Sequence, residues 1–257
     1  MNTAIITLSE TGAAVARRLA AKLGDCDIYL HECAQALAGE TSFPAVVPLT
    51  EEIFGSYRNL IYIAPCGVVV RAIAPLVCHK LSDPAVVVLD VGARWAVSLL
   101  SGHEGGANDL ALAVGNALHA EPVISTTTEA EKSVIVGIGC RRGTPADTLV
   151  AVIHEGLAMA GVSLQEVRYV ASAQLKSDEA GLLDACARLG IPLRFIAEDA
   201  IRACTRDFDT SSFVSNNVNL PAVAEPSALL AGTKTSCILN KTIIRGATIA
   251  IARENCW

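Results

Sequence analysis

The sequence predicts an α/β protein made of two small domains, each with a mixed or parallel sheet flanked by helices. Short runs rich in Val and Ile alternate along the chain with longer helical stretches that begin at capping residues or prolines. Hydrophobic residues make up 52% of the 257 positions and charged residues only 18%, which excludes a disordered chain. No apolar run reaches the ~18 residues of a membrane-spanning helix, so we expect a soluble protein without a membrane partner.

The cysteines and the N-terminus indicate a cytoplasmic protein. The nine cysteines are odd in number and include no CxxC pair, so they indicate neither a disulfide framework nor a zinc site. No basic side chain precedes the short apolar run at the start, unlike in a secretory signal. We therefore expect reduced thiols that mostly fill the core, and we predict no metal and no cofactor.

Charge divides the chain into two parts. The net charge is −6, which argues against non-specific binding to nucleic acid. Residues 1–133 carry 8 basic and 14 acidic side chains, whereas residues 134–257 carry 12 of each. The change falls in a polar stretch between two apolar runs. We therefore predict domains over 1–128 and 134–257, with a short linker at 129–133.

The first domain is expected to alternate strands with helices, which favours a sheet covered on both faces. Ser9 is a candidate N-cap and Gly24 a stop for the first helix, and Gly92 marks a turn between two strands. The expected strands are 3–8, 28–30, 60–64, 85–89, 95–100 and 123–125. The expected helices are 10–23, a stretch that follows Gly67 and runs through Ile73, and an alanine-rich stretch that follows Asn108 and runs to about Leu118.

Two loops after strands are candidate functional loops, because such sheets place function there. One is Pro65-Cys66-Gly67 and the other is the SGHEGGAN string at 101–108. In the second loop, His103 suits a general base, and glycine amides at a helix start suit an oxyanion. The alternative is a glycine-rich turn with a surface histidine. Arg71, one helical turn after the first loop, suits a carboxylate or is an ordinary solvated arginine.

The second domain repeats the α/β pattern. Pro145 at a first helical turn and Gly190 after a helix are its clearest boundary signals. The expected strands are 134–139, 167–171, 193–196, 236–239 and 247–252, and the expected helices are 145–160, 178–189 and 222–231.

The GIGCRRGT string at 137–144 is the most informative part of the second domain. Its GxGxxxG form resembles a dinucleotide-binding turn, but the next strand ends without the supporting acidic or basic residue. Arg141 and Arg142 suit a carboxylate-rich ligand, because a guanidinium can bind one carboxylate through two parallel bonds. The alternative is that both arginines are merely exposed.

Four further charged residues of the second domain are candidates. Lys176, Asp178 and Glu179 open a helix, where acids are ordinary partners of the helix dipole, and this interpretation is favoured for Asp178. Glu225 lies in an apolar stretch and either caps the following helix or faces a ligand.

Together these motifs resemble the cobalt-precorrin-5A hydrolase family, CbiG, of anaerobic cobalamin biosynthesis. The matching segments are 65–75, 83–88 and 99–108 in the first domain, and 136–144, 175–183, 223–225 and 248–253 in the second. Members of the family often carry a middle segment between the two domains. Here residue 126 passes to residue 134 through a handful of polar residues, so the chain resembles a short form without that segment.

The resemblance implies a reaction and a set of site residues. The family opens a lactone on a cobalt-containing tetrapyrrole and releases acetaldehyde, with the cobalt carried by the substrate. The implied catalytic residues are His103, Glu179 and Glu225. The implied substrate-binding residues are Cys66, Gly67, Arg71, Ser101, Gly102, Gly105, Gly106, Asn108, Gly139, Cys140, Arg141, Arg142, Gly143, Thr144 and Lys176.

Two other functions remain open at this point. One is a non-catalytic tetrapyrrole carrier of the same pathway, and the other is an NAD(P)-dependent oxidoreductase that uses the GxGxxxG turn. The expected partners are the tetrapyrrole and other enzymes of the pathway, and the sequence leaves open whether the protein is a homo-oligomer.

Overall fold

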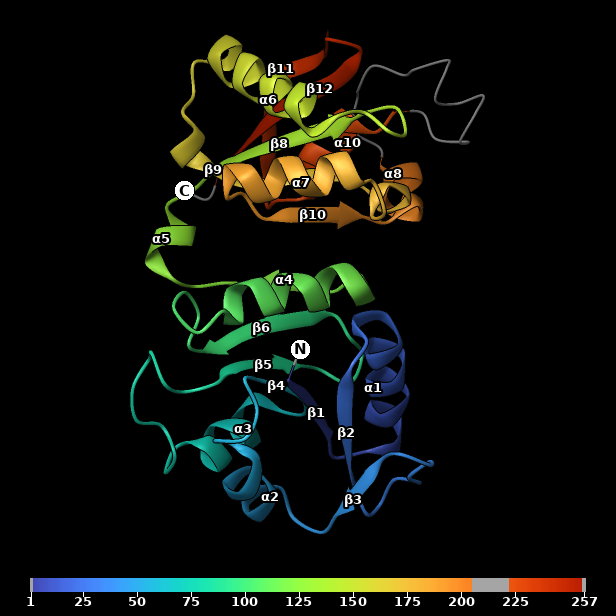
Figure 1. The fold of residues 1–257 in the computed structure, drawn as a ribbon, viewed down its shortest axis with the longest axis vertical. Coiled ribbons are helices and arrows are strands. Elements are labelled where there is room, and N and C mark those ends of the chain that lie inside the picture. The colour runs from blue at the N-terminus through green and yellow to red at the C-terminus, as the bar shows by residue number, and fades with distance from the viewer. Residues whose placement is uncertain (1, 205–221, 256–257) are drawn as a thin grey trace. The chain divides into compact units, whose positions relative to one another are not determined.

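The computed structural model describes residues 2–204 and 222–255, and the chain divides into two compact units, residues 1–126 and 127–257. Each unit holds one sheet with helices packed against it (Figure 1). The expected fold class, two α/β domains with mixed or parallel sheets, is therefore confirmed. The stretch expected as a linker overlaps a short helix, α5 (Thr127–Ala130).

The first unit contains a seven-stranded sheet in the order β3-β2-β1-β4-β5-β6-β7. The first five strands in this order are parallel, β6 runs antiparallel to β5, and β7 runs parallel to β6. The strands are β1 (Thr3–Thr7), β2 (Cys26–His31), β3 (Thr41–Phe43), β4 (Asn59–Ile63), β5 (Ala85–Leu89), β6 (Trp95–Leu100) and β7 (Glu121–Val123).

Helices cover both faces of this sheet, which is why its central strands β1, β4 and β5 are buried along their whole length. Ile5 and Ile61 pack in a core with α1 (Glu10–Leu23) and α4 (Ala107–Leu118). Leu60 and Tyr62 pack in a second core with α2 (Val46–Ile53) and α3 (Cys66–Ile73). The Ser9 hydroxyl accepts a hydrogen bond from the Gly12 amide at 3.1 Å, which confirms Ser9 as the N-cap of α1.

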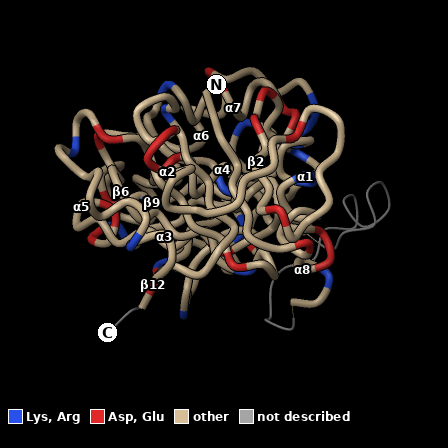
Figure 2. Tube along the Cα trace, turned by 90° about the horizontal axis from the view of Figure 1, so that it is seen from below, with Lys and Arg blue, Asp and Glu red and all other residues tan. Residues whose placement is uncertain are grey.

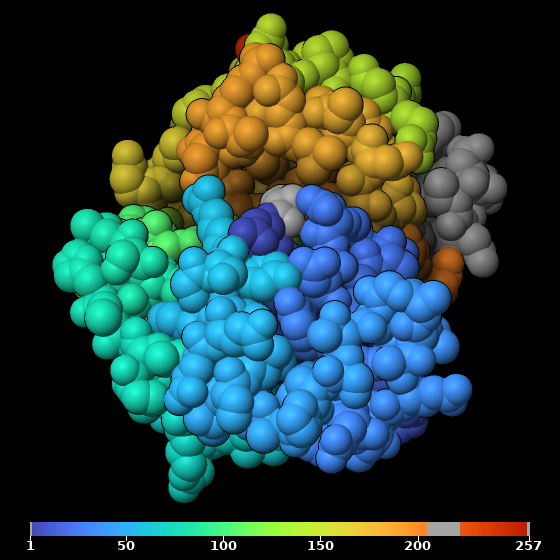
Figure 3. Space-filling view, turned by 60° about the horizontal axis from the view of Figure 1, so that its bottom comes forward, coloured from blue at the N-terminus to red at the C-terminus, as the bar shows by residue number. Residues whose placement is uncertain are grey.

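Two elements of the first unit were not expected from the sequence, namely β3 and α2. Pro48 lies in the first turn of α2, where a helix tolerates proline because the amides there have no partner within the helix. These elements form much of the face that Figure 3 presents in light blue. The strand expected at 123–125 is instead β7, at Glu121–Val123, where Pro122 is tolerated at the edge of the sheet.

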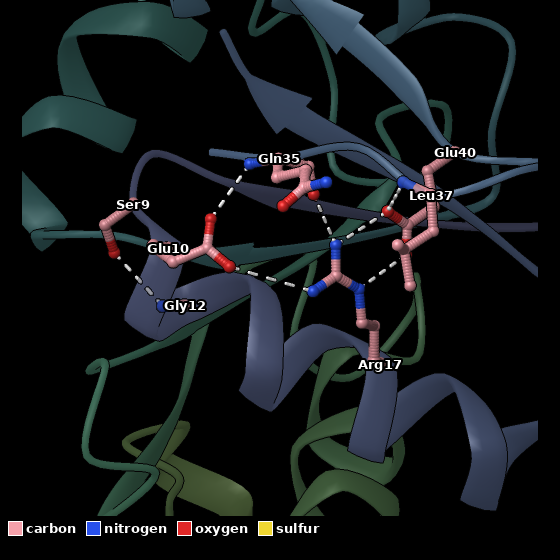
Figure 4. A network of polar contacts seen from close by, with 7 residues as sticks. All are labelled: Ser9, Glu10, Gly12, Arg17, Gln35, Leu37 and Glu40. Carbon is pink, nitrogen blue, oxygen red and sulfur yellow. Dashed lines mark hydrogen bonds and ion pairs between the residues drawn. The ribbon is translucent and has the colours of Figure 1, made fainter. Parts of the chain in front are cut away.

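A network of polar contacts fastens the connection between β2 and β3 to α1 (Figure 4). The Arg17 guanidinium donates to both carboxylate oxygens of Glu40, at 2.8 and 2.9 Å, and to the carbonyl of Gln35 at 2.7 Å. Glu40 also accepts from the Leu37 amide at 2.7 Å. The hydrogen bond from Arg17 lowers the pKa of the Glu40 carboxyl. The network therefore holds a segment with little secondary structure of its own.

The second unit contains a five-stranded sheet in the order β10-β9-β8-β12-β11. The first three strands in this order are parallel, and β12 and β11 form an antiparallel hairpin beside them. Arg245 and Gly246 join the hairpin with φ angles of 51° and 81°, the signs typical of a two-residue turn. The strands are β8 (Val134–Gly139), β9 (Val167–Ala173), β10 (Leu193–Ile196), β11 (Thr235–Ile244) and β12 (Ala247–Glu254).

The two faces of the second sheet are covered differently. Val134, Val136 and Ile138 of β8 pack in one core with α6 (Ala146–Ala160) and α7 (Ala180–Leu189). On the other face lies α10 (Ala224–Leu230), whose backbone approaches Gly137. The remaining helices are α8 (Glu198–Ala203) and two 3-10 turns, η1 (Leu164–Glu166) and η2 (Gln174–Lys176).

Charged residues are interspersed along the chain. In Figure 2 red and blue segments alternate over helices and loops, and α8 begins with acidic residues and carries a basic residue in its last turn. Among the residues that the structure describes, no helix has the length and apolar character needed to span a bilayer.

Candidate active site

The Pro65-Cys66-Gly67 loop lies at the carboxyl edge of the parallel strands in the first unit. Pro65 precedes the first residue of α3, and Cys66, Gly67 and Arg71 are all exposed. Arg71 donates from Nη1 to the carbonyl of Gly67 at 3.1 Å, so its guanidinium folds back over the loop. The structure therefore brings these three predicted residues together on one surface.

The SGHEGGAN loop is specified by close packing within itself. Ser101 has a φ of 58°, and a Cβ on Gly105 would lie 2.3 Å from the Ser101 Cβ, so only glycine fits there. The Asn108 side chain donates to Thr126 Oγ1 at 3.0 Å and accepts from Ser98 at 2.8 Å. These contacts leave His103 exposed at the tip of the loop.

This loop and the Pro65-Cys66-Gly67 loop lie at opposite edges of the sheet. Because β6 is antiparallel to β5, its carboxyl end lies beside the start of β5, where Ser101 donates to the carbonyl of Asp83 at 3.1 Å. The structure thus does not bring His103 together with Cys66 and Arg71 within the first unit. The short connection between β5 and β6 was a usable signal, because a parallel crossover needs a dozen or more residues.

A neighbouring loop that sequence reasoning missed lies beside His103. Lys80, in the connection between α3 and β5, forms an ion pair with Glu104. Lys80 also donates a hydrogen bond to the Glu104 carboxylate, and this bond lowers the pKa of that carboxyl. The Asp83 carboxylate holds the same connection in place by accepting from the amides of Cys78 and His79, in each case at 3.0 Å.

In the second unit, the loops after β8 and β9 meet at the carboxyl edge of the sheet. Glu179 precedes α7 and is 3% exposed, and its Oε1 accepts from the amide of Gly143 at 2.8 Å. A Cβ on Gly181 would lie 2.0 Å from the carbonyl oxygen of Thr144, so the two loops touch along their backbones. The structure therefore unites residues from the two motifs that the sequence analysis treated separately.

A lysine and a thiol flank the buried carboxylate. Lys176 ends η2 and is 9% exposed, and its Nζ lies 3.9 Å from Oε2 of Glu179. That oxygen has no hydrogen-bond donor within the described part of the chain. Burial raises the pKa of the Cys140 thiol, and the charge of Lys176 acts against this effect. A protonated thiol, an ammonium and a carboxylate are thus close together here.

The two arginines of the loop are both exposed at this edge. Arg142 donates to Asp178 at 2.8 Å, which raises the pKa of the guanidinium and lowers that of the carboxyl. The Arg141 carbonyl accepts from the Thr144 hydroxyl at 2.7 Å and so shapes the turn. Two guanidinium groups are thus exposed beside each other at this edge.

Glu225 is buried but does not join this group. It lies in the first turn of α10, is 5% exposed, and has one oxygen without a donor among the described residues. Burial, followed by the charge of Glu225, raises the pKa of the Cys237 thiol on β11 to about 11. The Cys140 thiol, in contrast, responds to Lys176 and Glu179. Glu225 therefore faces a different part of the sheet.

The first two glycines of the GxGxxxG string have a packing role. A Cβ on Gly137 would lie 1.9 Å from the Ala224 carbonyl oxygen, and one on Gly139 would lie 2.4 Å from Thr248 Oγ1. These glycines therefore admit α10 and β12 rather than a pyrophosphate, which removes the observation behind a dinucleotide site. Over residues 2–204 and 222–255, no three His, Cys, Asp or Glu side chains are grouped to hold a metal ion.

Comparison with known proteins places both units in one family. The model for "Cobalamin synthesis G N-terminal" matches residues 48–129, and that for "Cobalamin synthesis G C-terminus" matches residues 134–252. Only residues 130–133 separate the two matches.

Named relatives cover the chain to different extents. The cobalt-precorrin-5A hydrolase of Salmonella typhimurium is 26% identical over 322 residues, which span 88% of this chain and 91% of the relative. The cobalt-precorrin-5A hydrolase of Priestia megaterium is 24% identical over 357 residues, with 97% and 94% covered. Both alignments are longer than this chain, so these relatives contain residues that it lacks.

A third relative matches about half of the chain. Protein CobE of a Sinorhizobium species is 33% identical over 128 residues, with 49% of this chain and 83% of CobE covered. A crystal structure of CobE covers 48% of this chain with 32% identity and a TM-score of 0.45. From the two family models, which together span most of its length, the chain belongs to the cobalamin synthesis G family, CbiG.

Proposed function

We propose that this protein is a cobalt-precorrin-5A hydrolase, which opens the ring lactone of its substrate and releases acetaldehyde. The observation that carries this proposal is the similarity to two proteins of that name over more than 90% of their own length. In this proposal, the residues that those relatives have and this chain lacks are not required for the reaction. The substrate is a cobalt-containing tetrapyrrole, and the cobalt enters as part of it.

The first chemical step is the attack of water on the lactone carbonyl, which needs a base and donors for the oxyanion. His103 is exposed and suits the base, because imidazole titrates near neutral pH. The amides of Gly105 and Gly106, two and three residues after His103, lie just before α4 and suit the oxyanion. The exposed Arg141 and Arg142 of the second unit suit carboxylates at the periphery of the tetrapyrrole, whereas Arg71 lies at the other edge of the first sheet from His103.

The direct test is conversion of cobalt-precorrin-5A by the purified full-length protein. Acetaldehyde is followed through the NADH oxidation of coupled alcohol dehydrogenase, and the tetrapyrrole is followed by mass spectrometry. The proposal expects one acetaldehyde per substrate consumed. Substrate that binds but returns unchanged would instead support a tetrapyrrole carrier.

We also place the protein in the cytoplasm. Eight cysteines lie in the described residues and all eight are free thiols, which supports a reducing compartment.

A further inference from the structure

We propose that Lys176 and Glu179 form the acid–base pair that cleaves the carbon–carbon bond after the lactone has been opened. This inference rests on the proposed function, and it assigns the second chemical step to the carboxyl edge of the sheet in the second unit. It also assigns to Lys176 a chemical role in place of substrate binding alone.

The starting point is an ion pair that is buried yet not closed. Lys176 and Glu179 have side chains that are 11% and 3% exposed, and their charged atoms stay 3.9 Å apart. The comparably buried pair of Arg168 and Glu254 is in direct contact at 2.7 Å. A buried charge costs free energy unless hydrogen bonds satisfy its polar atoms. A buried ion pair without a direct hydrogen bond between its partners therefore calls for an explanation in terms of function.

The local backbone holds the carboxylate in one orientation. Glu179 Oε1 is occupied by the amide of Gly143, and Oε2 is left for another donor. Lys176 and Glu179 lie on either side of one turn, because the Glu179 amide donates to the carbonyl of Lys176 at 3.1 Å. The unoccupied oxygen and the ammonium are therefore presented together.

The chemistry of the second step needs these two groups. Opening the lactone gives two groups. One is a carboxylate that stays on the macrocycle, and the other is a hydroxyl group on the carbon that departs as acetaldehyde. Oε2 of Glu179 removes the hydroxyl proton, the carbon–oxygen double bond forms, and the carbon–carbon bond breaks. Its electron pair passes to the macrocycle carbon, which takes a proton from the Lys176 ammonium. A proton passed from Glu179 to Lys176 restores the starting state, so no oxidant or reductant is needed.

The other candidate residues fit this step less well. Glu225 lacks a neighbouring ammonium in the described structure and acts on the Cys237 thiol instead. His103 lies in a loop of the first unit, exposed and suited to water activation. Lys80 and Glu104 also form a Lys–Glu pair, but the Lys80 side chain is 66% exposed, so water screens the interaction between the two charges.

The test compares Glu179→Gln and Lys176→Arg with the wild-type enzyme on cobalt-precorrin-5A. Glutamine keeps an oxygen for the Gly143 amide but cannot accept the hydroxyl proton. Arginine keeps the charge but does not release a proton near neutral pH. Both variants should form the lactone-opened tetrapyrrole, heavier by one water, while acetaldehyde release falls by about 10²–10⁴-fold. KM should change little, since the substrate clamp is intact.

Controls separate this inference from misfolding and from the proposed function. Glu155→Gln changes a carboxylate on α6 that pairs with Arg245, and it should release acetaldehyde at the wild-type rate. Thermal unfolding verifies that each variant is folded. The acid–base assignment is overturned if either Glu179→Gln or Lys176→Arg releases acetaldehyde at the wild-type rate. Loss of lactone opening in a folded Glu179→Gln variant also overturns it. A wild-type enzyme that converts no substrate refutes the proposed function itself.

Discussion

Replacing Gly137 with alanine tests whether the glycine-rich string serves packing or ligand binding. The added Cβ would lie 1.9 Å from the carbonyl oxygen of Ala224 and 2.9 Å from the Cβ of Ala228. Neither neighbour is the end of a flexible side chain, so α10 as a whole must move. The Gly137 backbone cannot retreat, because it pairs with Ala250 of β12 on one side and Ala171 of β9 on the other.

The expected cost follows from that geometry. Overpacking of a core costs about 1–3 kcal/mol, and a clash with helix backbone belongs at the upper end of that range. For a unit of this size the thermal midpoint should fall by at least ~5 °C. Gly55→Ala is the matched control, because a Cβ there meets no atom within 4 Å. Its effect should stay within about 0.5 kcal/mol.

The assay is thermal unfolding of the full-length protein by circular dichroism, with hydrogen exchange to locate the change. Faster exchange should appear in peptides from β8 and α10, and the first unit should be unaffected. If Gly137→Ala unfolds at the midpoint of Gly55→Ala, the packing of α10 on β8 described above is wrong. Protection of the wild-type protein against unfolding by NADP would restore the dinucleotide interpretation.

Three further predictions concern catalysis, binding and acid stability. His103→Ala should slow lactone opening by about 10²–10⁴-fold without lowering the thermal midpoint, since the side chain is exposed; wild-type conversion would remove it as the base. The double variant Arg141→Ala, Arg142→Ala should raise KM, and unchanged substrate affinity contradicts the clamp. Because Arg17 lowers the pKa of Glu40 in the folded state, this pair stabilises the fold above the unfolded pKa of about 4.3. That contribution is lost as the pH falls through the pKa of Glu40 in the folded state. Glu40→Gln should therefore flatten the acid limb of a curve of stability against pH. An unchanged acid limb would show that the Arg17–Glu40 pair does not contribute to this pH dependence.

Much of the fold could be predicted because local chemistry and packing agree. The expected strands at 85–89, 95–100, 134–139 and 193–196 coincide with β5, β6, β8 and β10. Elements were missed where tertiary packing overrides weak local signals, as in α2, which accommodates Pro48, and in the three-residue strand β3.

The candidate site shows a similar limit. Asp178 and Glu179 are adjacent acids before a helix, and their residue types do not distinguish their roles. The structure separates them, because Glu179 is 3% exposed and bound to the Gly143 amide, whereas the Asp178 side chain is 65% exposed and bound to Arg142. In the turn that follows η2, Asp178 lies outward and Glu179 lies inward, and their residue types alone do not mark this difference.

In the proposed function, that separation would let one edge of the sheet both bind a polyanion and hold a catalytic pair. The outer pair of Arg142 and Asp178 is exposed on both sides, and such pairs contribute little to stability, so a substrate carboxylate can displace Asp178 at small cost. The inner pair of Lys176 and Glu179 is buried, and Oε1 of Glu179 is bound to the Gly143 amide. In the proposed reaction, binding would use the arginines and bond cleavage would use the buried pair, which lie on the same two loops. The neutral charge balance of residues 134–257 conceals this arrangement, because the basic side chains there are matched in number by acidic ones.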